Sequence, residues 1–288
     1  MSFQSYNSQK IIHRESSMAN GCRDWAREKR ISGIQFYGPR RDEFTSAIFS
    51  LLNGELPEEW EWIKSSSNSI VARRLEPSAA FYKEFLTRSP FEIIKALFRG
   101  SRCKRARVKR EILIQKGFHS PEIYCWGRKA QRHFMVTEGV DAIGLGMFIN
   151  QNWRPPLSKE KLFAKRMIIE KLGQEIGRLH KLGIYHGDLR LNNILIQQKD
   201  KDIKFHIIDN ESIYTFKKIP GRLIEKNLVQ VNVVFPLYVR RQDRLRFFKV
   251  YSRTYPRFTK IETSRLFERI QKRTLKRLTK IARRSGKG

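Results

Sequence analysis

The chain has 288 residues, 40% of them hydrophobic, which is enough to bury a real core. Lys and Arg number 59 against 28 Asp and Glu, a formal net charge of +31 that favours a polyanionic partner without choosing between nucleic acid, an anionic membrane face and a phosphorylated glycolipid. With no apolar run of membrane-spanning length, no signal-peptide core and three scattered cysteines, we expect a cytoplasmic protein without disulfides or a zinc site.

Taken in chain order, the sequence predicts a tail followed by two lobes. Residues 1–33 are polar and aperiodic and read as a poorly ordered tail. Residues 34–138 form the first lobe, in which an apolar run after Asp42 predicts a short helix ended by Gly54. Residues 139–288 form a second lobe, which ends in a basic helix.

Residues 68–86 predict two strands around a turn at Pro77. On the second strand, Lys83 shares one face with Phe81 and Phe85. A lysine between two inward phenylalanines is costly to bury without a charged partner. In a kinase the partners are ATP phosphates and a glutamate on the next helix, and the alternative is an edge-strand lysine whose ammonium reaches solvent.

A helix over residues 101–116, ended by Gly117, carries that glutamate as Glu111. Glu111 is the acidic residue in a helix full of Lys and Arg, and its alternative partners are Gln115 and Arg107 on the same helix. The basic segment 91–107 is either a solvated face or a surface for anionic substrate groups.

Strands are expected over residues 122–126 and 132–137, after which the strand-rich lobe gives way to a helical one. In a kinase this is the hinge that binds adenine through main-chain atoms. The candidates are the Glu138 carbonyl and the Val140 amide. The longest predicted helix then covers residues 158–182, capped by Ser158, with a packing role.

The segment 184–211 concentrates polar residues suited to phosphoryl transfer. Asp188 and Asn193 are five positions apart, and two apolar runs around a charged turn predict a hairpin that returns Asp209 beside Asn193. Asn193 and Asp209 supply oxygens of the kind that Mg²⁺ prefers. Asp188 is then the base for an attacking hydroxyl, and Arg190 helps neutralise the transferred phosphoryl group.

This spacing matches a kinase catalytic loop followed by a metal-binding Asp. The alternative is an ordinary helix-to-strand loop, because Asp and Asn are common turn formers. After Asp209 the chain lacks an A-P-E element and leads by a short connection into helix, which weakens a protein-substrate interpretation.

Residues 262–284 predict a basic amphipathic helix with an apolar stripe. The stripe consists of Leu266, Ile270, Leu275, Leu278 and Ile281. Such a helix either lies on an anionic membrane or packs on the second lobe with a basic end in solvent.

Together these segments resemble the lipopolysaccharide core kinase (Kdo/WaaP) family of the protein kinase-like superfamily. The resemblance covers roughly residues 62–251 and rests on AFYKEFL at 80, RGSRCKRARVKREILI at 99, TEGV at 137, HGDLRLNNILI at 186, IIDNES at 207, and NLVQVN with DRLRFFKVY near Asn227 and Asp243. It implies an α+β, bilobal protein kinase-like fold, with an antiparallel-sheet first lobe containing one main helix and a mostly helical second lobe.

The resemblance also implies ATP-dependent phosphorylation of a Kdo or heptose hydroxyl in the lipopolysaccharide inner core, at the cytoplasmic face of the inner membrane. ATP and Mg²⁺ are the implied cofactors and a lipid-linked anionic glycan the implied substrate. Lys83 would contact phosphates, with Glu111 anchoring it. The glycine-rich loop is missing, so Ser66 and Asn68 would cover the phosphates instead, or nucleotide binding would be weaker.

Two other functions fit the same residues. One is an atypical RIO-like serine/threonine protein kinase, which also lacks a long activation segment. The other is a degenerate kinase fold that binds nucleic acid or a membrane through its charge. The sequence does not identify the sugar or hydroxyl, the oligomeric state or the need for a second protein.

Overall fold

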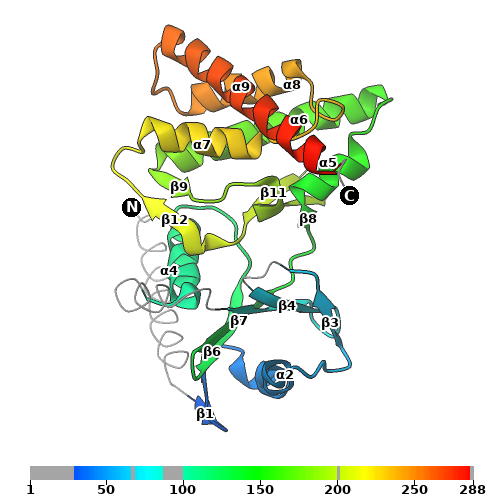
Figure 1. The fold of residues 1–288 in the computed structure, drawn as a ribbon, viewed down its shortest axis with the longest axis vertical. Helices are drawn as coiled ribbons and strands as arrows, with labels where there is room; N and C mark the ends of the chain where they lie inside the picture. Colours follow the sequence, from blue (N-terminus) through cyan, green and yellow to red (C-terminus); the bar gives the residue numbers. More distant parts are fainter. Residues whose placement is uncertain (1–28, 66–68, 87–99, 200–201, 286–288) are drawn as a thin grey trace, which may run out of the picture. The chain divides into compact units, whose positions relative to one another are not determined.

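The computed structural model describes residues 29–65, 69–86, 100–199 and 202–285 (Figure 1). The described residues divide into two compact units, one formed by the chain up to residue 105 with residues 121–140, the other by residues 106–120 with the chain from residue 141. The helix that carries Glu111, α4 (Arg102–Gln115), was predicted to belong wholly to the first lobe. Instead, its residues from Ala106 group with the second unit.

The first unit is built on one antiparallel sheet of seven strands, in the order β1-β2-β6-β7-β5-β4-β3. Its strands are β1 (Lys29–Ile31), β2 (Ile34–Tyr37), β3 (Trp60–Ile63), β4 (Ser69–Arg74), β5 (Ala80–Phe85), β6 (Ile123–Lys129) and β7 (Arg132–Glu138). The predicted strand pair around Pro77 is β4 and β5. The tail prediction is wrong for residues 29–31, because they pair with β2.

Helix α2 (Arg41–Asn53) supplies the core of the first unit. Phe44 and Ile48 are fully buried, and the Phe44 ring stacks on Tyr124 at 5.6 Å between centroids. The helix ends at Gly54, whose positive φ of 86° allows its N–H to close the last turn, as the sequence predicts.

The second unit is mostly helical, with α5 (Leu145–Asn152), α6 (Lys159–Lys181), α7 (Gly221–Val231), α8 (Arg241–Thr254) and α9 (Lys260–Ser285). Helix α6 is capped by Ser158, whose hydroxyl accepts from the Lys161 N–H. It packs on α8 closely enough that a Cβ at Gly177 would lie 2.7 Å from the Thr254 Cβ. Among the described residues, no helix combines the length and the apolar composition that a bilayer crossing requires.

The predicted apolar stripe of α9 is correct only in part. Leu266, Ile270 and Leu278 are buried, but Leu275 is 51% exposed and Ile281 is 40% exposed. The fully buried Thr274 continues the i, i+4 row instead, because a threonine is small enough to lie in the contact. Helix α9 therefore packs on its own unit, and Glu225 of α7 forms ion pairs with its Arg269 and Arg273.

Five short strands complete the second unit: β8 (Ile143–Gly144), β9 (Ile184–His186), β10 (Ile194–Lys199), β11 (Asp202–Ile207) and β12 (Ile213–Thr215). β10 and β11 form the predicted hairpin, in register from Ile194 opposite Ile207 to Lys199 opposite Asp202. β9 pairs with β12, and this pairing positions the chain directly before Asp188.

Candidate active site

Asp188 follows β9 and precedes a 3₁₀ turn (Leu191–Asn193). The chain turns tightly here because Gly187 lies against the backbone after Asp209. Its N–H donates to the Ser212 carbonyl at 2.8 Å, and a Cβ at Gly187 would lie 2.9 Å from that oxygen. Any larger residue would push Asp188 out of place.

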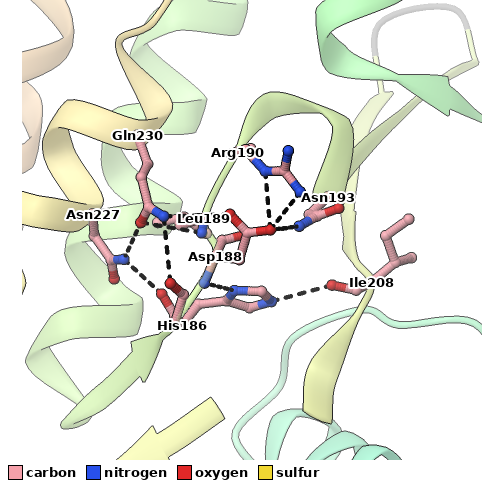
Figure 2. A network of polar contacts seen from close by, with 9 residues as sticks. His186, Asp188, Leu189, Arg190, Asn193, Ile208, Asn227 and Gln230 are labelled. Atoms are coloured by element: carbon pink, nitrogen blue, oxygen red, sulfur yellow. Dashed lines mark hydrogen bonds and ion pairs between the residues drawn. The ribbon is translucent and has the colours of Figure 1, made fainter. Parts of the chain in front are cut away.

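Both carboxylate oxygens of Asp188 are held by side chains (Figure 2). Oδ2 accepts from Arg190 Nη2 at 2.6 Å and Nε at 2.9 Å, and from Asn193 Nδ2 at 3.2 Å. Oδ1 accepts from Gln230 Nε2 at 3.3 Å. The carboxyl group is 33% exposed, so it is oriented yet open to an incoming hydroxyl.

Arg190, which was predicted to be a site residue, thus forms an ion pair with Asp188, and its side chain is 64% exposed. Its guanidinium binds one carboxylate oxygen through two nitrogens, a geometry that also suits phosphate oxygens. The role predicted for Arg190, neutralising the transferred phosphoryl group, stays a prediction.

His186 links the Asp188 loop to the end of β11. Its Nδ1 accepts from the Asp188 N–H at 3.1 Å, which leaves the proton on Nε2 to be donated to the Ile208 carbonyl at 3.1 Å. Burial lowers the pKa of His186, so the ring is neutral and this pattern is maintained at neutral pH. One uncharged ring therefore ties Asp188 to the residue before Asp209.

Helix α7 supports the same loop with two amides to which the sequence analysis assigned no role. Gln230 accepts from the Leu189 N–H and donates to the Gly187 carbonyl, both at 3.3 Å. Asn227 donates to the His186 carbonyl at 2.6 Å and to Gln230 Oε1 at 3.0 Å. The sequence contained a signal for the burial of both side chains, because an Asn and a Gln three residues apart interrupt an otherwise apolar helical face.

A second histidine extends this network into α6. His180 Nε2 donates to Asn227 Oδ1 at 3.2 Å, and its Nδ1 accepts from the Tyr251 hydroxyl at 2.9 Å. Complete burial lowers the pKa of His180 to about 4, despite the hydrogen bond to Asn227. The support that α6 and α7 give to the backbone around Asp188 thus consists of neutral groups.

The hairpin brings the two predicted metal ligands to one end. The Ile208 N–H donates to the Asn193 carbonyl at 3.0 Å, so Asn193 lies opposite the residue before Asp209. Asn193 Nδ2 points at Asp188, leaving Oδ1 as the ligand oxygen. Asp209 has a left-handed backbone with φ 61°, a conformation that Asp tolerates better than most residues.

These donors are of the hard kind that Mg²⁺ prefers, and they include none of the thiolate or imidazole ligands typical of zinc and copper sites. An amide oxygen and a carboxylate are hard ligands that leave positions for water and phosphate. Within the described ranges, no group of three His, Cys, Asp or Glu side chains is arranged to hold a metal by itself. Asn193 and Asp209 alone supply few ligands, as suits a Mg²⁺ that also binds water and phosphates, and their role as metal ligands stays a prediction.

The predicted phosphate contacts of the first unit are described only in part. Lys83 on β5 is half-buried, and its Nζ lies 5.3 Å from the Phe85 ring centroid. Phe85 is buried as predicted, but Phe81 is 38% exposed, because the alternate residues of β5, including Tyr82, face the core of the unit. Ser66 and Asn68 lie outside the described residues.

Glu111 is 54% exposed and accepts from Arg110 Nη1 at 2.9 Å, a partner different from the helical alternatives Gln115 and Arg107. Its role as the anchor of Lys83 stays a prediction. At the predicted hinge, the Glu138 N–H donates to the Glu122 carbonyl at 2.8 Å, and the Gly139 N–H donates to the Ala79 carbonyl at 2.9 Å. The adenine contacts assigned to Glu138 and Val140 stay predictions.

The antiparallel sheet of the first unit and the helices, catalytic-type loop and hairpin of the second define a protein kinase-like fold. A solved structure titled "WaaP in complex with acyl carrier protein" has the same fold, with a TM-score of 0.53 and 22% identity over 79% of this chain and 95% of that chain.

Residues 126–251 match the model of the lipopolysaccharide kinase (Kdo/WaaP) family, which confirms the family resemblance predicted from the sequence. The lipopolysaccharide core heptose(I) kinase WaaP of Pseudomonas aeruginosa is 28% identical over 130 residues, 43% of this chain and 47% of the relative. The 3-deoxy-D-manno-octulosonic acid kinase of Mannheimia succiniciproducens is 38% identical over 79 residues, 27% of this chain and 31% of the relative. The chain thus spans less than half the length of either relative.

Proposed function

We propose that this protein is an ATP-dependent kinase that phosphorylates a Kdo or heptose hydroxyl of the lipopolysaccharide inner core. The observation that carries the proposal is the fixed carboxylate of Asp188, held on both oxygens beside Asn193 and the end of β11. This site lies within the segment that matches the family, and both named relatives act on sugars of that class. The net charge of +31 suits an anionic glycolipid.

In this mechanism Asp188 accepts the proton of the attacking sugar hydroxyl, which its exposed carboxyl edge can reach. Gln230 and Asn193 keep that carboxyl in one orientation, so little reorganisation precedes transfer. Arg190 exchanges its contact with Asp188 for a phosphate oxygen. Asn193 and Asp209 would hold Mg²⁺, which neutralises phosphate charge when bound, and Lys83, anchored by Glu111, would contact the phosphates.

Replacing the base tests the reaction. Asp188→Asn should reduce phosphate transfer from ATP to purified core glycolipid by about 10²- to 10⁴-fold, because the amide cannot take up the proton. The matched control is Asp202→Asn, an exposed carboxylate at the start of β11, which should leave transfer unchanged. Unchanged transfer in Asp188→Asn contradicts the proposal, and label that enters protein bands instead of lipid favours a protein kinase.

Nucleotide binding separates an active kinase from a degenerate fold. Lys83→Ala should weaken Mg-ATP binding, measured by calorimetry, by about tenfold or more, because it removes a charge on the phosphates. Lys64→Ala, an exposed lysine of the same unit, is the control. Equal affinity of wild type and Lys83→Ala is the result expected of a protein that binds polyanions only through its net charge.

We also propose that the protein works at the cytoplasmic face of the membrane that carries its lipid-linked substrate. The support is its strongly basic composition together with the lipid-linked nature of the proposed substrate.

A further inference from the structure

Most of the apolar stripe of α9, the segment that the sequence offered for membrane contact, is covered by the protein itself. Leu266, Ile270 and Leu278 are each at most 5% exposed. A side chain buried in the core cannot also enter a bilayer. The buried part of the stripe is therefore not available for membrane contact.

Exposed apolar side chains gather at the turn between α7 and α8, residues 235–241. Phe235 is 43% exposed and Leu237 is 56% exposed. The turn is closed by the Phe235 carbonyl, which accepts from the Tyr238 N–H at 3.0 Å and the Val239 N–H at 3.2 Å. These apolar groups are thus presented by a hydrogen-bonded turn.

The 235–241 turn separates two surface cavities. Leu237 and Arg240 line one of about 370 Å³, whose other walls include Trp153, Pro156 and Arg166. Pro236 and Arg241 line the second, of about 330 Å³, together with the exposed Leu275 of α9. The turn, called the ridge below, thus contributes to two hollows, and the first of these also contains charged side chains.

The arginines beside the ridge differ from the other charged groups of the first cavity. Lys165 and Arg246 both contact Asp243 there, at 2.8 Å and 3.7 Å. By contrast, Arg166, Arg240 and Arg241 are exposed, and none has an ion-pair partner among the residues that the structure describes. Their positive charge is available to an external anion.

We propose that the 235–241 turn and Arg166 form a docking surface for an anionic phospholipid bilayer. This inference rests on the proposed function, which requires access to a lipid-linked substrate. Phe235 and Leu237 enter the interfacial region, where apolar side chains bind, while Arg166, Arg240 and Arg241 contact lipid phosphates. Exposed apolar groups between arginines favour a bilayer over a nucleic acid, because they add little to contacts with a phosphate backbone.

Vesicle flotation tests the surface with the full chain. Wild type should float with vesicles of phosphatidylglycerol mixed with phosphatidylcholine and much less with phosphatidylcholine alone. Leu237→Asp should weaken binding at least about tenfold, because it places a negative charge at the interface. The double variant Arg166→Glu/Arg241→Glu should weaken it about 25-fold or more, at about fivefold for each lost positive charge.

Two controls match these variants in chemistry. Leu75→Asp alters an apolar residue of the first unit that is 60% exposed, and Arg277→Glu/Lys280→Glu reverses two exposed charges of α9. Each should change binding less than the matching ridge variant. The proposal is overturned if wild type does not float with anionic vesicles, if it binds both vesicle types equally, or if the α9 variant loses as much binding as the ridge variants.

A parallel assay keeps this inference separable from the proposed function. Leu237→Asp and a second ridge variant, Phe235→Ser, should phosphorylate delipidated core oligosaccharide at the wild-type rate and unfold at the wild-type temperature. Loss of flotation with retained transfer supports the docking surface. Absence of phosphate transfer in every form of the protein contradicts the proposed function. In that case the flotation results still show whether the docking surface binds anionic vesicles.

Discussion

Helix α7 holds the loop of Asp188 through the neutral amides of Asn227 and Gln230, but it holds α9 through the charged carboxylate of Glu225. The amides are at most 7% exposed, and Glu225 is nearly as buried at 8%, but the two arginines that face Glu225 have side chains 54% and 56% exposed. Buried neutral hydrogen bonds are insensitive to salt and costly to break, while ion pairs at the surface are screened. The backbone around Asp188 is therefore held by contacts that changes in ionic strength affect little, although the ion pair of its carboxylate with the exposed Arg190 is open to screening.

The largest effect should come from removing the central amide of the neutral network. Asn227→Leu leaves the His186 carbonyl and the His180 Nε2–H buried without partners, which should lower the free energy of unfolding by about 3 kcal/mol. Urea unfolding measures this loss. Asn150→Leu, at an exposed position of α5, should stay within about 0.5 kcal/mol of wild type. A loss that small in Asn227→Leu would show that the network does not stabilise the fold.

A more selective change is Gln230→Glu, which keeps the side-chain shape but puts a carboxylate near Asp188. The donor nitrogen now 3.3 Å from Asp188 Oδ1 becomes an oxygen, so repulsion should lower kcat about tenfold or more. Affinity for Mg-ATP should remain near the wild-type value. Equal losses in kcat and in nucleotide affinity would indicate general disruption of the unit and not loss of positioning.

The neutral network should make stability depend on acidity. Unfolded His180 takes up a proton as the pH falls below 6.5, whereas folded His180 remains neutral down to about pH 4. Stability should therefore fall by about 1.4 kcal/mol per pH unit across that window. His186 acts in the same direction, because burial also lowers its pKa. Denaturant unfolding of His180→Gln should show a shallower slope, and an unchanged slope would contradict this origin.

The smallest effect should come from the ionic attachment. Burial would raise the pKa of Glu225, but hydrogen bonds from Arg273 and Arg269 outweigh it and lower the pKa. The stabilisation is present above the ordinary value of 4.5 and is lost as the pH falls through the lowered pKa. At neutral pH, Glu225→Gln should cost about 0.5–1 kcal/mol in dilute buffer and less at high salt. An equal cost at both salt concentrations would mean that packing holds α9.

Local patterns predicted the elements whose signals are local. Ser158 and the regular apolar spacing that follows located α6, and the charged turn between two apolar runs located the β10–β11 hairpin. The same hairpin placed Asn193 and Asp209 at one end of the strand pair, because register follows from the turn. Asp188 could be found because its spacing from Asn193 is set by one tight loop.

Features that depend on distant packing were not predictable in this way. Periodicity assigns polar residues to the surface, so the burial of Asn227, Gln230 and Thr274 was missed, although each lies in a helix–helix or helix–loop contact. Periodicity likewise assigns apolar residues at helical spacing to the buried face, so Leu275 was wrongly placed in the stripe of α9. Strand β1 is too short and polar to show a pattern, and it forms only by pairing with β2.

The left-handed backbone at Asp209, the proposed Mg²⁺ ligand, determines which substitution best tests that role. Alanine is the usual replacement for a metal-binding aspartate, but at φ 61° it would combine loss of the carboxylate with backbone strain in the turn beside Asn193. Asparagine accepts this conformation more readily and keeps the side-chain volume. Asp209→Asn is therefore the better reference for complementation in cells, since a failure to complement could then be attributed to lost chemistry and not to degradation.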